Sequence, residues 1–149
     1  MSKSLKLGIA ADHAGFELKE YLKKYMQEKG FELTDFGTNS AEASDYADFA
    51  HPLGSAIETG KLEWGISICG SGNGINMVVN KYSHVRSALC WNKEIATLAV
   101  SHNNANIFAL PARFISKEEA IEILNAILNT EFEGGRHQRR IDKIPPPSC

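Results

Sequence analysis

The sequence predicts an α/β fold of three layers, a doubly wound, Rossmann-like sheet of five parallel strands with helices on both faces. Short apolar runs alternate with amphipathic stretches along the whole chain, the order expected when helical crossovers join parallel strands. No internal repeat and no linker interrupts this alternation, and 149 residues suit one domain. We therefore expect a single domain over residues 1–149, with a basic C-terminal segment from about residue 133.

Apolar runs predict the strands. The first, LKLGIAA, is mostly apolar, as in a strand buried on both faces of a sheet. In chain order, the predicted strands cover residues 5–11, 31–36, 64–69, 85–90 and 106–110.

Spacing and end signals indicate the helices. Apolar residues at helical spacing predict a first helix around residues 18–26, and Gly30 is a natural stop. Pro52 must either begin or kink a second helix over residues 47–59. Two further helices are predicted over residues 75–82 and 92–101, and Ser116 and Glu119 form a capping box for the last.

Composition excludes several classes of protein. A formal net charge of −2 gives no reason to expect nucleic acid or an anionic membrane as a partner. Three cysteines without CxxC spacing argue against a disulfide framework and a structural zinc site. The start of the chain lacks the long apolar stretch of a signal peptide, and no apolar run approaches the length of a membrane span. The expected location is the cytoplasm.

Polar residues and glycines follow the predicted strands. Asp12 and His13 follow the first, residues 37–38 follow the second, and residues 69–74 follow the third. Because ligands of open parallel sheets bind beyond the carboxyl ends of the strands, these segments should meet at one site. Taken alone, Asp12 is equally well explained as a helix N-cap, and His13 as a solvent-facing residue.

The glycine-rich segment Cys69-Gly70-Ser71-Gly72-Asn73-Gly74 is the strongest physical signal. A glycine loop that leads into a helix aims backbone N–H groups at an anion, although it could also be a plain tight turn. It is not a P-loop, because no GK[ST] follows, and it does not match the dinucleotide pattern GxGxxG.

Cys69 stands directly before this loop, where N–H groups and the helix end favour a thiolate. A buried, unreactive thiol is an equally good interpretation of its position. Cys90 ends a strand without such a loop and is expected to be a core residue, and Cys149 to be a terminal thiol.

Two further polar groups remain ambiguous. His102 and Asn103 follow a helix, where they either cap it or contribute to a site. Arg136 and Arg140 are four residues apart, so they share one helical face and could grip a phosphate together. Considered alone, such a charged run is more often a solvated tail.

Five segments resemble the type B ribose-5-phosphate isomerase family, which groups with galactose-6-phosphate and allose-6-phosphate isomerases. In order, they are ADHAG (11–15), SDYADFA (44–50), ICGSGNGI (68–75), SHNNAN (101–106) and EGGRHQRR (133–140). The resemblance spans nearly the whole chain. It implies that Cys69 is the proton acceptor and His102 the proton donor that opens the sugar ring. It also implies a set of substrate-binding residues: Asp12, His13, Tyr46, Gly70, Ser71, Gly72, Asn73, Gly74, Asn103, Arg113, Arg136 and Arg140.

The implied reaction interconverts ribose 5-phosphate and ribulose 5-phosphate through an enediolate. A thiolate can abstract the proton, backbone N–H groups can stabilise the enediolate, and arginines can hold the phosphate. We expect no cofactor and no metal, because histidines and carboxylates do not cluster at ligand spacing in the sequence. The alternatives are the same chemistry on a six-carbon sugar phosphate, a non-catalytic flavodoxin-like binding module, and a thiol redox switch without a nearby resolving cysteine.

The strand order also predicts a homodimer with shared active sites and leaves open whether two dimers pair into a tetramer. Cys69 follows a strand, whereas His102 precedes one, so the two should lie at opposite edges of a parallel sheet. A strand of about five residues spans roughly 17 Å, which is more than a side chain can bridge. If both residues act on one sugar, a two-fold partner is expected to supply His102.

Overall fold

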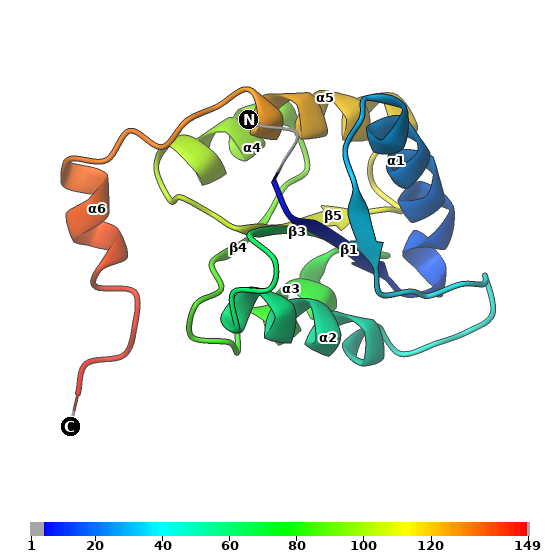
Figure 1. The fold of residues 1–149 in the computed structure, drawn as a ribbon, viewed down its shortest axis with the longest axis horizontal. Helices are drawn as coiled ribbons and strands as arrows, with labels where there is room; N and C mark the ends of the chain where they lie inside the picture. Colours follow the sequence, from blue (N-terminus) through cyan, green and yellow to red (C-terminus); the bar gives the residue numbers. More distant parts are fainter. Residues whose placement is uncertain (1–4, 149) are drawn as a thin grey trace.

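The computed structural model describes residues 5–148, which form one parallel sheet covered by helices (Figure 1). The strand order is β2-β1-β3-β5-β4, and each neighbouring pair is parallel, so the predicted fold class is confirmed. The strands are β1 (Leu7–Ala11), β2 (Leu33–Asp35), β3 (Trp64–Cys69), β4 (Ser87–Leu89) and β5 (Ile107–Pro111).

Helices cover both faces of the sheet. One face is covered by α1 (Phe16–Glu28), α4 (Lys93–Ser101) and α5 (Lys117–Leu128), and the other by α2 (Tyr46–Glu58) and α3 (Asn73–Val79) (Figure 1). Each face buries its own apolar cluster, with Phe108 under the first group of helices and Ile107 under the second. Successive residues of β5 therefore point into opposite layers, as alternation along a strand requires.

Local signals in the sequence account for most element ends. Gly30, with φ 90, ends the turn after α1, and Ser116 and Glu119 form the reciprocal capping box of α5, with both bonds at 3.0 Å. Pro52 lies inside α2 rather than at its start, and the helix continues on both sides of it. The helix expected to begin at residue 75 begins at Asn73, because Gly72 turns the chain just before it.

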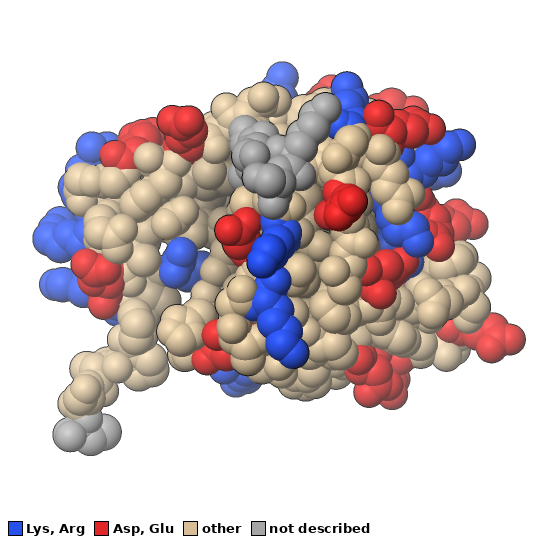
Figure 2. Space-filling view, viewed as in Figure 1, with Lys and Arg blue, Asp and Glu red and all other residues tan. Residues whose placement is uncertain are grey.

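The chain ends in a short separate helix, α6 (Arg136–Ile141), which stands at the left of Figure 1. Basic side chains gather over it in Figure 2, and the helix ends before the three prolines at 145–147, which cannot continue a helix. His137 and Ile141 are its buried residues, so α6 packs on the body through these two side chains. Within residues 5–148, every helix is too short or too polar to cross a bilayer.

A buried charge network supports the carboxyl edge of the sheet. The fully buried Lys19 donates to Asp35 at 2.6 Å, Lys23 donates to the same carboxylate at 2.9 Å, and the Gly37 N–H donates at 2.8 Å. Burial acts to raise the pKa of Asp35, but hydrogen bonds from Lys19, the Gly37 N–H and Lys23 outweigh it and hold that pKa below its usual value. The Gly37 carbonyl in turn accepts from the Ala11 N–H at 2.8 Å, so this network holds the chain directly before Asp12.

Candidate active site

A pocket of about 560 Å³ opens at the carboxyl ends of β1 and β3. From β1 the chain runs outward to β2. From β3 it runs the other way, to the edge strand β4 and then back to β5, so the pocket lies where the strand order reverses. Ligands of doubly wound sheets bind at this switch point. The pocket is lined by Asp12, His13, Ala14, Tyr46, Cys69, Gly70, Ser71, Gly74, Arg113 and Phe114.

Asp12 and His13 are held by local hydrogen bonds. Asp12 Oδ1 accepts from the N–H groups of Ala14 and Gly15 at 3.0 and 3.2 Å, so Asp12 is both a cap and a pocket residue. Ser44 fixes His13: its hydroxyl accepts from the His13 N–H at 3.0 Å, and its backbone contacts His13 Nδ1 at 3.1 and 3.2 Å. Nδ1 is therefore engaged, which leaves Nε2 as the ring nitrogen available to a ligand.

Cys69 ends β3 opposite the last residue of β5 and is 4% exposed, at the inner wall of the pocket. The loop after it turns at Gly72, whose φ of 76 is a left-handed conformation that favours glycine. A Cβ at Gly74 would meet the Tyr46 ring at 2.5 Å, so the ring of Tyr46 packs directly on this backbone. Because Gly74 has no side chain, the Tyr46 ring can contact the loop backbone close to the Cys69 thiol.

Cys90 has a different environment. It is fully buried in the core, and burial alone raises the pKa of its thiol to about 12. Cys90 is thus a core residue, as expected, and Cys149 lies outside the described residues.

Six of the predicted site residues are not among those that line the pocket. Gly72 and Asn73 belong to the same glycine segment, where they form the turn and the first residue of α3. The other four, His102, Asn103, Arg136 and Arg140, lie at the end of α4 and on α6.

His102 and Asn103 lie at the amino edge of the sheet, as the strand order predicts. His102 caps α4, and the following segment reaches the start of β3, where the Gly65 N–H donates to the Asn106 carbonyl at 2.9 Å. Cys69 pairs with Pro111 at the other end of β5, four residues after Ile107. At about 3.3 Å per residue, β5 alone separates the two edges by roughly 13 Å.

His102 belongs to a cluster with Glu133 and His137. The two imidazole rings stack with centroids 4.1 Å apart, and Glu133 lies 3.9 Å from His102 Nε2 and 3.6 Å from His137 Nε2. Burial, followed by the electrostatic effects of His102, Arg136 and Arg140, lowers the pKa of His137 against the opposing effect of Glu133. The expectation that histidines and carboxylates do not cluster is therefore wrong, because folding brings residue 102 beside the turn between residues 133 and 137.

Three contributors to the pocket were missed from the sequence. Phe114, which follows β5, lines the pocket and is 74% exposed, and Ala14 lines it beside His13. The rule that selected Asp12 and Cys69, applied to the fifth strand, would have selected Phe114. The role of Ser44 in orienting His13 has no such signal, because these residues are 31 positions apart.

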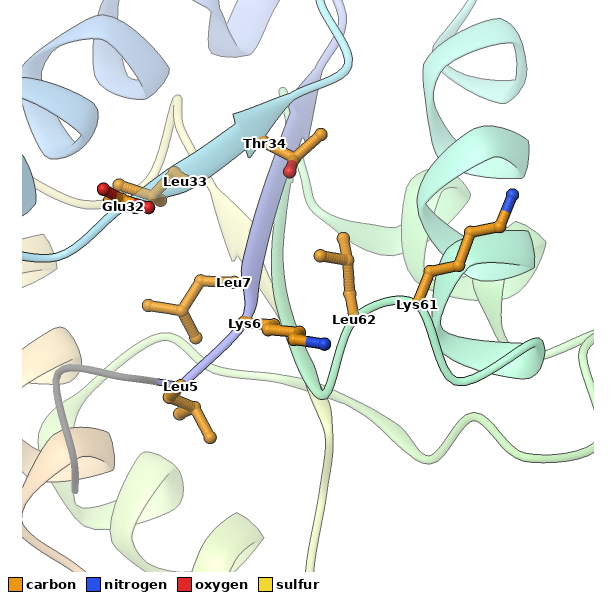
Figure 3. Close-up of a pocket in the computed structure, with 8 residues that line it drawn as sticks. All are labelled: Leu5, Lys6, Leu7, Glu32, Leu33, Thr34, Lys61 and Leu62. Carbon is orange, nitrogen blue, oxygen red and sulfur yellow. The ribbon is translucent and has the colours of Figure 1, made fainter.

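Another hollow, of about 460 Å³, lies at the amino ends of β1 and β2 (Figure 3). Its polar side chains include Lys6, Glu32 and Lys61, which do not converge on one point in Figure 3. Cysteine and histidine are not among the described residues that line it. None of the site residues predicted from the sequence is among the described residues that line this hollow.

Comparison with known proteins agrees with this geometry. Residues 7–144 match the family described as Ribose/Galactose Isomerase. The chain belongs to this family. A ribose 5-phosphate isomerase from Thermotoga maritima superposes with a TM-score of 0.91, at 48% identity over 94% of this chain and 97% of that one. The resemblance to type B ribose-5-phosphate isomerases is thereby confirmed.

Two other members of this family differ in the substrates that their names give. Ribose-5-phosphate isomerase B from Mycoplasma genitalium, with bound ribulose-5-phosphate, has a TM-score of 0.90 at 40% identity over 95% of this chain and 94% of that one. A D-erythrulose-4-phosphate isomerase from Pectobacterium atrosepticum is also 40% identical, over 94% of this chain and 93% of its own. Similar identity therefore accompanies sugar phosphates of different length.

Proposed function

We propose that this isomerase interconverts ribose 5-phosphate and ribulose 5-phosphate through an enediolate, with Cys69 as the base. The observation that supports this best is the pocket at the switch point, in which the Cys69 thiol shares one cavity with Asp12, His13 and the glycine segment. A redox switch is less well supported, because the other described cysteine is buried in the core. The cytoplasmic location stays a prediction from the sequence.

The reaction moves one proton between two carbons of the open sugar. In its thiolate form, Cys69 takes the proton from the carbon next to the carbonyl and returns it to the neighbouring carbon. The backbone of Gly70 to Gly74 borders the thiol, so its N–H groups are suited to stabilise the oxygen on which negative charge develops. Asp12 and His13 are suited to bind sugar hydroxyls, because both are held rigidly at the pocket wall.

Ring opening and phosphate binding are assigned to a partner subunit. Among the described residues that line the pocket, Arg113 is the one permanent cation, and a phosphate dianion needs more charge than that. His102, Asn103, Arg136 and Arg140 lie elsewhere on the same chain. We propose that a two-fold dimer brings these residues of one subunit to the pocket of the other, with His102 as the proton donor for ring opening.

The exposed apolar side chains support such a dimer. Phe114 is 74% exposed at the pocket, Met77 is 65% exposed on α3, and Trp91 is 48% exposed just after β4. Large apolar side chains left open on a single chain are typical of surfaces that a partner covers. Further pairing of dimers into a tetramer stays a prediction.

The second candidate is the same chemistry on a sugar phosphate of another length. It is favoured by the family description, which includes galactose, and by the similarity to an isomerase of a four-carbon sugar phosphate. A purely binding, flavodoxin-like role is less well supported, because the thiol would then have no part in it.

An isomerase assay on chelator-treated protein tests the proposal. Ribose 5-phosphate, allose 6-phosphate, galactose 6-phosphate and erythrulose 4-phosphate would be compared by kcat/KM. We expect the highest value for ribose 5-phosphate. A higher kcat/KM for another sugar phosphate would show that this sugar, and not ribose 5-phosphate, is the preferred substrate. No turnover of any of the four would contradict the proposed isomerase activity.

A further inference from the structure

The cluster of His102, Glu133 and His137 has the composition of a metal site. Each residue offers one ligand atom, and these three atoms lie within 4.8 Å of one another. Two imidazole nitrogens and one carboxylate oxygen form a ligand set that Zn²⁺ and similar borderline divalent cations favour.

The buried state of His137 adds an independent observation. His137 is 5% exposed, and its Nε2 is buried without a hydrogen-bond partner. A buried polar atom without a partner costs roughly 1–3 kcal/mol, so such an atom in a folded chain calls for an explanation. This nitrogen faces Glu133 at 3.6 Å, which is too long for a hydrogen bond and leaves it available to a ligand.

The backbone holds the three residues in place. The Glu133 N–H donates to the Ser101 carbonyl at 3.0 Å, which fixes Glu133 beside the end of α4, where His102 lies. The His137 N–H donates to the Gly134 carbonyl at 3.1 Å, which closes the turn between the other two ligands. The rings of His102 and His137 stack nearly parallel, at 17°, so binding of one cation by both requires the partly exposed His102 ring to rotate out of the stack.

We propose that His102, Glu133 and His137 bind one Zn²⁺ or a similar divalent cation, and that this cation inhibits the enzyme. Ligand atoms around a tetrahedral Zn²⁺ lie about 3.4 Å apart, given bond lengths of about 2.1 Å. Separations of up to 4.8 Å must therefore shorten by up to about 1.4 Å, and the half-exposed side chains of Glu133 and His102 have room to move. Three protein ligands leave the fourth position to water.

Inhibition follows from competition for one nitrogen. A cation bound to the His102 ring nitrogen takes the place of the proton that His102 would donate during ring opening. Binding at the cluster does not depend on the proposed function, whereas inhibition rests on the assignment of His102 to that function. The two parts can therefore be tested separately.

Binding would be measured by calorimetric titration of chelator-treated protein with ZnCl₂, after alkylation of accessible thiols. We expect one Zn²⁺ per chain, with imidazole NMR signals of His102 and His137 shifting together. Glu133→Gln and His137→Gln should each weaken binding by about tenfold or more, the effect typical even of outer-shell changes. Glu133 is exposed, so its variant should fold normally even if the His137 variant does not.

His84→Gln is the matched control. His84 also pairs with a glutamate, Glu58, at 3.1 Å. Among the described residues, however, these two do not belong to a group of three metal-ligating side chains. Its variant should bind Zn²⁺ like the wild type. Absence of binding, or equal binding by the Glu133 and His84 variants, would overturn the site.

Activity measured against free Zn²⁺ completes the test. We expect inhibition that a chelator reverses and that Glu133→Gln shifts to higher Zn²⁺ by the same factor as binding. Binding without inhibition would support the site but overturn the inhibitory role, and it would count against His102 in the reaction.

Discussion

The pocket at the carboxyl edge and the histidine cluster at the amino edge differ in how they are built. Pocket residues follow strands, and neighbours hold them, as the cap bonds of Asp12 and the Ser44 contacts of His13 show. The cluster joins the end of α4 to a turn and a short helix at the margin of the molecule (Figure 1). One region is rigid and holds the thiol, and the other is peripheral and lies beside the arginines.

Under the proposed function, neither region has all the groups that the reaction needs. The pocket contains the Cys69 thiol and a glycine backbone, but its lining includes a single arginine among the described residues. The amino edge carries two histidines and the arginines of α6, but its cluster has no cysteine. A division of chemistry between two edges of one chain is what a two-fold dimer with shared sites requires.

The largest expected effect is the loss of Cys69. Cys69→Ala should lower kcat by about two to four orders of magnitude, because a general base is removed, while substrate binding is retained. Steady-state kinetics and calorimetric titration with ribose 5-phosphate would check both. Near-normal turnover would show that Cys69 is not the base.

Complementation then tests the division between the two edges. Inactive Cys69→Ala and inactive His102→Ala would be mixed under conditions that exchange subunits. If the site is shared, each heterodimer has one intact site, and activity should rise to about half of the wild-type value per heterodimer. With exchange verified by mass spectrometry, no recovery would mean that both residues act from the same chain.

The next effect concerns the support of the pocket. Asp35→Asn should destabilise the fold by about 3 kcal/mol, because the buried Lys19 ammonium loses its carboxylate partner at 2.6 Å and keeps only the partly exposed Glu20 at 3.6 Å. Urea unfolding would measure this, and Asp142→Asn, an exposed change on the peripheral side, should stay within about 0.5 kcal/mol.

The same carboxylate should give an acid dependence. Because the folded pKa of Asp35 is lowered, its stabilising contribution is present above about pH 4 and is lost as pH falls through the folded pKa. The Asn variant should show a flatter stability profile in that acid range. Identical profiles would contradict the role of this network.

A smaller effect is expected on α6. Arg136→Ala and Arg140→Ala should each raise KM by about tenfold, since each removes charge-assisted bonds to a phosphate that does not react. Arg139→Ala, on the same helix and equally exposed, is the matched control and should leave KM within about twofold. Equal KM values in all three variants would indicate that α6 is a solvated tail.

The smallest expected effect is at Cys90. Cys90→Ala should leave kcat within about twofold and destabilise the fold by about 1 kcal/mol, as for an average core change. At neutral pH the wild-type Cys90 should resist iodoacetamide, since its thiol pKa is about 12, whereas Cys69 borders the pocket and should be alkylated faster. Peptide mass spectrometry would measure alkylation at each cysteine, and equal labelling of Cys69 and Cys90 would contradict the expected difference in reactivity.

The sequence by itself determined the sheet and the position of the pocket residues at its carboxyl edge. Alternating apolar runs and helical spacing act locally, so the strands, the capping box of α5 and the glycine turn before α3 were all predictable. The rule for parallel strands then placed Asp12, His13 and Cys69 together, because chain direction alone decides which edge a residue occupies.

Only the tertiary structure decided the contacts between distant segments. The pairing of Lys19 with Asp35, the hold of Ser44 on His13, and the grouping of His102 with Glu133 and His137 leave no periodic trace. These contacts depend on the paths that loops of different length take across the folded domain. Residues so distant in the sequence come into contact only once the core has packed.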